Sequence, residues 1–314
     1  MNNNFSNLKK LMLQYDNNDP ILFLIFNRLD TTSKVFEEIR KAKPKKLYIA
    51  ADGARNTEEL IKCNKVRKVA TDVDWDCEIK TLFREKNLGC GRAVSEGIKW
   101  FFEQEEKGIV LEDDCLPDIS FFGFCSELLK FYEYDERIGH ICGSNFQNGQ
   151  IRGEASYYFS GLTHVWGWAS WRRVWKDYDF NLKTLPNFNP KLEAFPAHQP
   201  FAATWFRNFS NVALGHIDTW DYQYAYLNLI KGYKAIMPNI NLISNIGVGA
   251  DATHTLDEHP FAALGLGHLK EINHPELLIQ NVEADMYTQI KEYYIVPRKN
   301  FLSRLWKSIK TKIR

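Results

Sequence analysis

The chain has 314 residues, of which 45% are hydrophobic and 25% are charged, so its composition is that of an ordinary globular protein that can bury a full core. Because 40 lysines and arginines nearly balance 39 aspartates and glutamates, the formal charge is only +1, which excludes a general attraction for nucleic acid. The six cysteines contain no CxxC pair, no signal peptide is recognised and no segment reaches the roughly 18 apolar residues of a membrane span, so the sequence predicts a cytoplasmic protein with reduced thiols.

Strands and helices are predicted to alternate after a polar extension over residues 1–19. The run ILFLIF at 21–26 has the near-continuous apolarity of a strand covered on both faces. Asn27 and Arg28 follow it, and Asp52 follows a second apolar run. A strand, helix, strand unit is a right-handed crossover, so Asp52 is expected at the same sheet edge as Asn27. The predicted strands of this part are 21–26, 47–50 and 78–83, and the predicted helices are 31–42 and 58–71.

A glycine-containing loop precedes the next predicted helix, 92–106. Gly89, Gly91 and Gly97 do not fit the G-x-G-x-x-G dinucleotide fingerprint, because Val94 occupies the third glycine position. The segment instead predicts a tight loop that leads into a helix, whose amino end can meet an anion and whose Gly97 permits close packing on the sheet.

Three consecutive carboxylates, Glu112, Asp113 and Asp114, end the predicted strand 108–111. Ligands bind at the carboxyl ends of strands in open α/β sheets, and adjacent carboxylates are costly without a compensating cation or hydrogen-bond donors. Mg²⁺ or Mn²⁺ is the simplest compensation, since these ions take oxygen ligands and typically bind one or two protein carboxylates. Strand alternation points side chains 112 and 114 to one face and 113 to the other, so the three are not all expected as ligands. The alternative is a solvated acidic turn in which Asp118 caps the next helix.

A tryptophan-rich segment, 161–179, follows a predicted helix over 119–136 and a predicted strand over 140–143. Trp166 and Trp168 lie next to glycines and are candidates for the wall of a sugar site, where aromatic faces stack on C–H groups. The alternative for these side chains is an ordinary core.

A candidate catalytic base lies in the second half of the chain. Thr219 or Asp218 is predicted to begin a helix that ends at Gly232 and carries Asp221 in its first turn. The helix dipole favours an ionised carboxylate there, so Asp221 can act as a base. Acidic residues also occur in first turns for stability alone, and that alternative stays open.

Three other segments carry predictions. The proline-containing stretch 181–205 is predicted to be a loop-rich flap or acceptor loop, and His254 lies in a later glycine-containing loop. The segment 298–314 has seven lysines and arginines, no acid, and apolar residues at helical spacing, which is typical of an interfacial helix attracted to anionic lipid. A basic tail that packs on its own domain is the alternative.

Taken together, these motifs resemble glycosyltransferases of the GT-A fold, the nucleotide-diphospho-sugar transferase superfamily, over roughly residues 20–255. The resemblance rests on the Asn27, Arg28 exit of the first strand, on Asp52, on the loop with Asn87, Gly89, Ala93 and Gly97, and on EDD at 112–114 as a DxD-type motif. EDD followed by a proline, a phenylalanine pair and a helix is similar to N-acetylglucosaminyltransferase I and its relatives. Asp221 precedes Gly232 and Tyr233 as the catalytic base does in family 2-like inverting enzymes, but Trp220 replaces the usual Glu, which leaves Asp218 as a rival base.

The resemblance implies an α/β fold of GT-A (Rossmann-like) type, a mixed, mainly parallel sheet flanked by helices. Residues 20–143 would form the nucleotide-sugar-binding half, 144–255 the acceptor-binding half, and 256–314 a C-terminal helical extension. Asp114 would hold Mn²⁺ or Mg²⁺, with His254 completing the metal site in some relatives. The residues expected to bind the donor are Asn27, Arg28, Asp52, Asn87, Gly89, Arg92, Glu112 and Asp113, and those expected to bind the acceptor are Trp166 and Trp168.

The expected activity is transfer of a sugar, with inversion, from a nucleoside diphosphate sugar, a UDP-sugar being favoured, to a glycan or lipid-linked acceptor. Such an enzyme would be cytoplasmic or peripheral on the cytoplasmic membrane face. Two rivals are a sugar nucleotidyltransferase and a non-catalytic carbohydrate-binding or membrane-associated protein that retains the fold. The first would be expected to carry a glycine-rich loop directly after the first strand, and IFNRLDTTSK has no glycine there.

Overall fold

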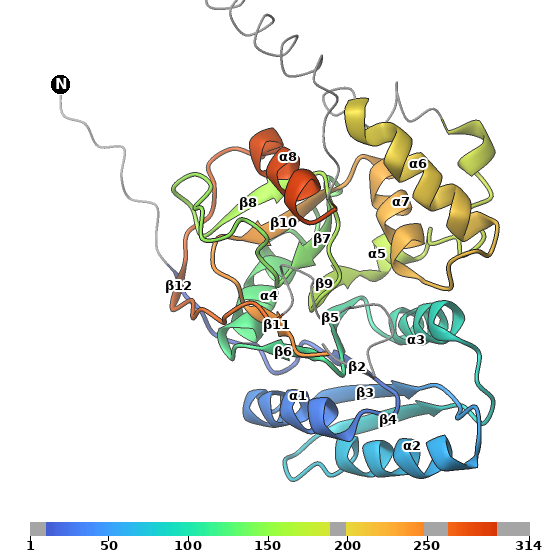
Figure 1. The fold of residues 1–314 in the computed structure, drawn as a ribbon. Coiled ribbons are helices and arrows are strands. Elements are labelled where there is room, and N and C mark those ends of the chain that lie inside the picture. Colours follow the sequence, from blue (N-terminus) through green and yellow to red (C-terminus); the bar gives the residue numbers. More distant parts are fainter. Residues whose placement is uncertain (1–10, 189–198, 248–262, 294–314) are drawn as a thin grey trace, which may run out of the picture.

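The computed structural model describes residues 11–188, 199–247 and 263–293 (Figure 1). His254 and the basic segment 298–314 lie outside the described residues, so the metal role of the first and the membrane role of the second stay predictions. None of the helices in the described ranges has the length and apolar surface needed to traverse a bilayer.

A central sheet of eight strands organises the fold. The strands β4, β3, β2 and β5 are all parallel, β9 is antiparallel to both β5 and β7, β10 is parallel to β7, and β8 is antiparallel to β10. In order across the sheet they are β4 (Glu78–Phe83), β3 (Lys46–Ala51), β2 (Ile21–Ile25), β5 (Lys107–Glu112), β9 (Trp168–Trp171), β7 (Ile138–Cys142), β10 (Lys234–Pro238) and β8 (Tyr157–Ser160). The predicted α/β class, with a mixed, mainly parallel sheet flanked by helices, is therefore confirmed.

The packing of β2 on both of its faces explains why its sequence is apolar throughout. Phe23 contacts Phe36 of α1 (Leu29–Ala42), with ring centroids 6.5 Å apart. The next residue, Leu24, lies on the other face, against Gly97 of α3 (Cys90–Gln104). Because successive side chains of a strand point to opposite faces, α1 and α3 cover opposite faces of the sheet and both sets of side chains must be apolar.

The remaining helices of the first half also follow the predicted order. Helix α2 (Thr57–Ala70) packs against α1, and α4 (Ser120–Phe131) packs on β5, β7 and β9. Asp118 accepts a hydrogen bond from the backbone N–H of Ser120, the first residue of α4, at 2.8 Å. The alternative of a solvated acidic turn is wrong, because Asp113 is only 3% exposed. Helix α1 begins at Leu29, two residues before the predicted start.

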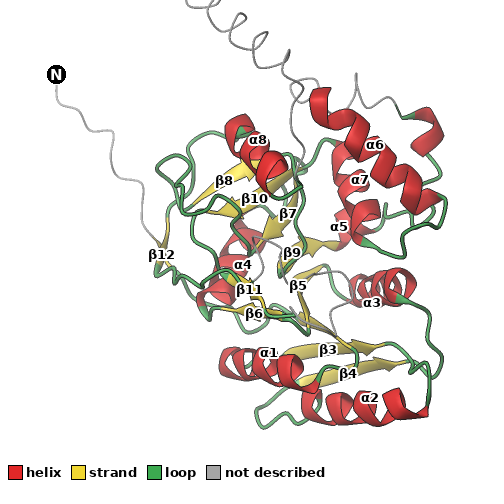
Figure 2. Cartoon of the chain, in the orientation of Figure 1, coloured by secondary structure: helices red, strands yellow, loops and turns green. Residues whose placement is uncertain are grey.

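Two helices of the second half, α6 (Gln199–Ala213) and α7 (Asp221–Lys231), lie side by side (Figures 1 and 2). The loop-rich structure predicted for 181–205 is wrong for its last residues, which belong to α6. Prolines dominate the pattern at 186–200, but Phe201, Trp205 and Phe209 recur at helical spacing and are buried in a second apolar cluster. The short helices α5 (Arg172–Trp175) and Leu185–Asn187 precede α6.

Segments from both ends of the described chain pack on this framework. Strand β1 (Leu11–Met12) pairs with β12 (Glu271–Ile272), and β11 (Ile243–Asn245) pairs with β6 (Cys115–Pro117), both antiparallel. Helix α8 (Val282–Lys291) packs on β8. The terminal extensions predicted at 1–19 and 256–314 thus each contribute an element that pairs with or packs on the rest, while the predicted division into halves stays a prediction.

Candidate functional site

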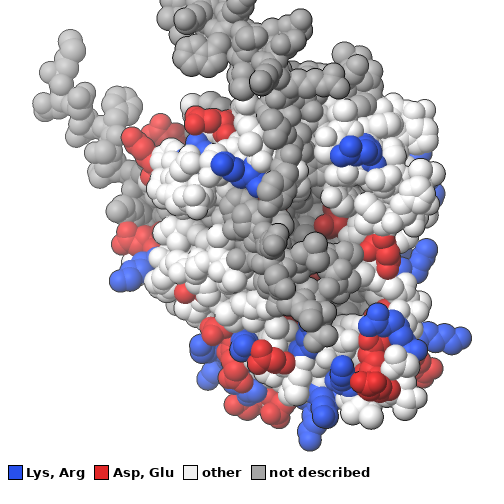
Figure 3. Space-filling model, in the orientation of Figure 1, with Lys and Arg blue, Asp and Glu red and all other residues white. Residues whose placement is uncertain are grey.

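A pocket of about 990 Å³ opens at the carboxyl ends of β2, β3 and β5. Its acidic half is lined by Arg28, Asp52, Glu112, Asp113 and Asp114. Its aromatic half is lined by residues far along the chain, Phe146, His164, Trp166, Trp205, Tyr222, Glu292 and Tyr293. On the face of the molecule in view in Figure 3, charges of both signs mingle over the part formed by α1, α2 and β4 and are sparse above it.

Arg28 compensates two of the three consecutive carboxylates. Its Nη2 lies 2.9 Å from Oδ2 of Asp114 and also contacts Oδ1 of Asp113. Burial alone would lower the pKa of Arg28, but the charges of Asp113 and Asp114 outweigh it and raise that pKa. Strand β5 ends at Glu112, so Asp113 and Asp114 lie in a turn and both reach one guanidinium. The strand alternation expected to separate Asp113 from Asp114 is therefore wrong.

Glu112 is the carboxylate of the triplet that lacks this compensation. Burial and the negative charges of Asp114, Asp113 and Asp221 raise the pKa of Glu112 well above its ordinary value, although Arg28 opposes the shift. Within the described residues no hydrogen bond holds its side chain. Glu112 and Asp221 both line the pocket.

Asp52 joins the end of β3 to the loop that precedes α3. Its carboxylate accepts hydrogen bonds from the backbone N–H groups of Leu88 at 3.0 Å and Gly89 at 3.2 Å. Asn87 Nδ2 donates a hydrogen bond to the carbonyl of Gly53 at 2.7 Å, which also joins the end of β3 to the loop that precedes α3. Burial raises the pKa of Asp52, against these hydrogen bonds. The structure thus brings Asp52, Asn87 and Gly89 to the pocket, as the sequence predicts, and gives Asp52 a role in shaping the loop.

Of two other residues predicted to bind the donor, Asn27 lies in the wall of the pocket and Arg92 lies outside it. Asn27 lines the pocket and its Nδ2 donates to Oε1 of Glu59 on α2 at 2.9 Å. Arg92 does not line the pocket: its guanidinium lies over the ring of Phe180 and 3.5 Å from Glu96, with the side chain 52% exposed. A role for Arg92 in donor binding stays a prediction.

The two rival bases have different partners. Asp218 Oδ1 accepts a hydrogen bond from the backbone N–H of Gly91 at 3.0 Å, so this carboxylate holds the amino end of α3. A Cβ on Gly91 would lie 2.6 Å from the carbonyl oxygen of Thr219 and 2.7 Å from Asp218 Oδ1, which explains the glycine. Asp221 is the first residue of α7, and its Oδ1 accepts hydrogen bonds from Thr219 Oγ1 and from the N–H of Tyr222. Both of these bonds use Oδ1, and among the described residues no hydrogen bond involves Oδ2 of Asp221.

Only one of the two tryptophans predicted for the acceptor reaches the pocket. Trp166 is half-buried and lines it. Trp168 is fully buried inside β9, with its ring centroid 5.9 Å from Trp220 and 5.0 Å from Tyr224. The prediction for Trp168 is wrong because it lies in a central strand, and Gly167 between the two residues has φ of 60°, which turns the chain at the edge of the pocket.

Several pocket residues carry no sequence prediction. His164 lies two residues before Trp166, and this spacing on an extended segment is the signal that could have placed it in the wall. Glu292 and Tyr293 come from the end of α8, and nothing in their local sequence points to the pocket. Burial and the charges of Glu292, Tyr222 and Asp221 raise the pKa of Tyr293, and all four residues line the pocket.

The donor set fits a hard divalent ion that arrives with a substrate. Within the described residues, no group of three or more His, Cys, Asp or Glu side chains forms a ready metal site. Such ions commonly bind one or two carboxylates and complete their shell with substrate phosphates and water. Glu112 and Asp114 offer two carboxylates on the wall of the pocket.

Comparisons with known proteins add a likeness of fold. No family model and no curated protein matches the chain. Among solved structures, an active-site mutant of LgtC is 10% identical over 86% of this chain and 94% of its own, with a TM-score of 0.38. The galactosyltransferase LgtC with donor and acceptor sugar analogs is 11% identical over 69% of this chain and 72% of its own (TM-score 0.37), and HddC from Yersinia pseudotuberculosis is 13% identical over 56% and 87% (TM-score 0.33). Identities this low speak only to the fold, and TM-scores below 0.5 do not distinguish between enzyme classes.

Proposed function

We propose that this protein is a glycosyltransferase that moves a sugar from a nucleoside diphosphate sugar to a hydroxyl of a glycan or lipid-linked acceptor. The observation that carries the proposal is the pairing, in one pocket at the carboxyl edge of the parallel strands, of the acidic turn bound by Arg28 with Asp221 at the start of α7. The acidic half suits a nucleoside diphosphate and the aromatic half suits an acceptor sugar. A UDP-sugar is the favoured donor.

The acidic half would bind the diphosphate. Asp114, with Glu112, would hold Mn²⁺ or Mg²⁺, and the bound ion supplies positive charge that stabilises the departing diphosphate. Arg28 keeps Asp113 and Asp114 in place and adds a fixed positive charge beside the phosphates. Asp52 and Asn87 shape the loop against which the nucleoside would lie.

Asp221 would be the base of a single displacement. Its Oδ2 takes the proton of the acceptor hydroxyl while that oxygen forms a bond to the anomeric carbon. The bond between the anomeric carbon and the diphosphate oxygen breaks, and the diphosphate leaves with the electron pair. Attack opposite the leaving group inverts the anomeric configuration. Asp218, bound to the N–H of Gly91, would instead hold α3 in position.

The two rivals make different predictions. A nucleotidyltransferase would form a nucleotide sugar and pyrophosphate from a nucleoside triphosphate and a sugar phosphate, but β2 is followed by Arg28, which is engaged with two carboxylates. A non-catalytic sugar-binding protein would bind carbohydrate without turnover, and it would not need a carboxylate at the position of Asp221.

The decisive experiment measures donor turnover. The purified protein is incubated with a panel of nucleoside diphosphate sugars and glycan acceptors, with Mn²⁺, with Mg²⁺ and with a chelator, and products are identified by mass spectrometry. We expect release of a nucleoside diphosphate that stops with the chelator, and a glycosidic product whose inverted anomer is identified by NMR. Formation of a nucleotide sugar from a nucleoside triphosphate, or no turnover of any donor, would refute the proposal.

A further inference from the structure

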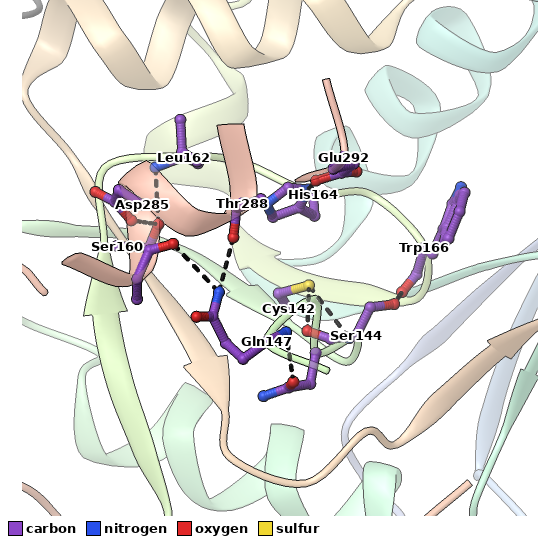
Figure 4. Close-up of polar contacts among 12 residues, drawn as sticks. Cys142, Ser144, Gln147, Ser160, Leu162, His164, Trp166, Asp285, Thr288 and Glu292 are labelled. Atoms are coloured by element: carbon purple, nitrogen blue, oxygen red, sulfur yellow. Dashed lines mark hydrogen bonds and ion pairs between the residues drawn. The ribbon is translucent and has the colours of Figure 1, made fainter. Parts of the chain in front are cut away.

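A carboxylate and an imidazole lie together in the aromatic half of the pocket. Oε2 of Glu292 is 3.3 Å from Nδ1 of His164, and their side chains are only 10% and 5% exposed. Figure 4 shows Glu292 at the end of α8, beside the ring of His164. The position of His164 is fixed by a hydrogen bond from Nε2 of His140 to its carbonyl oxygen at 2.7 Å.

Helix α8 is anchored without Glu292. Asp285 accepts hydrogen bonds from Ser160 and, at 2.9 Å, from the N–H of Gly161. Thr288 receives a hydrogen bond from Gln147 at 2.8 Å (Figure 4). Gln289 receives one from Trp205 at 2.9 Å. Successive turns of the helix are therefore held by other side chains, so packing of α8 does not explain a buried carboxylate at its end.

The Glu292 carboxylate is incompletely satisfied. Its Oε2 is buried and makes no hydrogen bond of good geometry within the described residues, although Nδ1 of His164 lies 3.3 Å away. Buried carboxylate oxygens are normally hydrogen-bonded, and an exception in a pocket indicates a place for hydroxyl or N–H groups of a ligand. The rings of Trp166, Tyr222 and Tyr293 line the same pocket, are partly exposed and offer apolar faces for a sugar.

We propose that Glu292, positioned by His164, is the group that recognises the acceptor, by accepting hydrogen bonds from hydroxyls of a neutral sugar stacked in the aromatic half. The proposal rests on the proposed function and adds a substrate class to it. With Asp221 in the same pocket, a second carboxylate repels an acceptor sugar that carries its own carboxylate. The aromatic half therefore selects neutral sugars against hexuronic acids.

The test is direct binding, which does not depend on turnover. Saturation-transfer NMR measures binding of the methyl α- and β-glycosides of glucose, galactose and mannose, and of the matching methyl hexuronosides, to the full chain in the presence of UDP and Mn²⁺. We expect the wild-type protein to bind at least one neutral glycoside about tenfold or more tightly than its uronoside, the effect of one like-charge contact. Glu292→Gln should weaken binding of the neutral glycoside and reduce this preference to about twofold, with the affinity for UDP unchanged.

Glu283→Gln is the matched control, because Glu283 lies on the same helix with its side chain 86% exposed and outside the pocket. It should leave the preference as in the wild type, and melting temperatures of both variants show whether α8 is still docked. Equal binding of neutral and acidic glycosides by the wild type, binding of neither, or an unchanged preference in Glu292→Gln would overturn the inference. If the preference depends on Glu292 but no donor is turned over, the proposed function fails and the sugar site stands.

Discussion

Arg28 Nη2 lies 2.9 Å from Asp114 Oδ2 and also contacts Asp113, so one guanidinium joins the exit of β2 to the turn that follows β5. The two strands are hydrogen-bonded neighbours, with Leu24 opposite Glu112. The acidic turn is therefore held in shape before any substrate arrives, and its geometry depends on a residue 85 positions away in the chain.

Replacing Arg28 should destabilise the protein in a pH-dependent way. Removing one partner of a largely buried ion pair leaves a buried charge, so Arg28→Ala should lower the free energy of unfolding at pH 7 by about 3 kcal/mol. Without the cation, burial raises the pKa of Asp113 further above its unfolded value, so the loss should shrink as the pH falls and that carboxyl is protonated. Urea unfolding between pH 4 and 8 measures both effects. Arg40→Ala is the control, since Arg40 is equally exposed at 23% but pairs with exposed acids, and it should cost about 1 kcal/mol or less.

Glu112 should destabilise the ligand-free protein above its raised pKa. A carboxyl whose folded pKa exceeds its unfolded value of 4.5 costs nothing below pH 4.5, and the cost grows as the pH rises towards the folded pKa. Glu112→Gln should therefore be more stable than the wild type at pH 8 in the presence of a chelator, with the advantage lost near pH 4.5. Urea midpoints across this range test the sign. Glu103→Gln, at a side chain 60% exposed, should show no such trend, and a flat difference for Glu112→Gln would contradict the assignment.

We expect Asp221 to act as the catalytic base and Asp218 to have a structural role. Loss of a general base typically lowers turnover by about 10²–10⁴-fold, so Asp221→Asn should lose transfer while UDP binding is kept. Asn at position 218 can still accept the hydrogen bond from Gly91, so Asp218→Asn should retain most activity, whereas Asp218→Ala should lose about 1 kcal/mol of stability. Steady-state kinetics with thermal melts decide between them. An Asp218→Asn variant as inactive as Asp221→Asn would reverse the two roles.

Gly247 should be required for the position of Asp114. A Cβ at Gly247 would lie 2.1 Å from Asp114 Oδ2 and 2.7 Å from Arg28 Nη1, so Gly247→Ala must displace the carboxylate or the loop. We expect the Mn²⁺ concentration for half-maximal turnover to rise about tenfold or more, since small shifts of a ligand weaken a metal site strongly. Gly265→Ala is a matched control, because a Cβ there meets no atom within 4 Å. Equal metal dependence in the two variants would contradict a metal role for Asp114.

Trp166 and Trp168 should affect different properties. Trp168→Ala removes a fully buried ring and should cost about 3–5 kcal/mol in unfolding free energy. Trp166→Ala should cost little stability and raise the acceptor KM, with the KM of the donor unchanged. Melts and acceptor titrations of both variants measure this contrast, which disappears if Trp166 does not contact the acceptor.

The first half of the fold could be predicted from the sequence because each element has a local signal. The strand at 78–83 and the apolar run of β2 are bounded by polar residues and alternate with amphipathic helices. The second half depends on pairings between distant segments. Strand β9 is only four residues long, and its place between β5 and β7 is set by pairing with Val110 and Cys142 rather than by a pattern of its own.

In the candidate site too, residues with a local sequence signal could be predicted and residues placed by distant contacts could not. Asp52, Asn87 and Glu112 could be predicted because parallel strands end at a common edge, so residues after each strand converge. The ion pairs of Arg28 with Asp113 and Asp114 could not be predicted, because the alternation of side chains along a strand does not continue through the turn at Asp113. Glu292 could not be predicted either, because only the docking of α8 on β8 carries the end of that helix to the pocket.

The two halves of the pocket are built from separate stretches of sequence: the carboxylates around Arg28 come from residues before 115, and the rings around His164 from residues after 145. A change among the rings around His164 can therefore alter which molecule is accepted without touching the contacts of Arg28 with Asp113 and Asp114. Diversification of products in such a protein needs no change in the residues that perform the reaction.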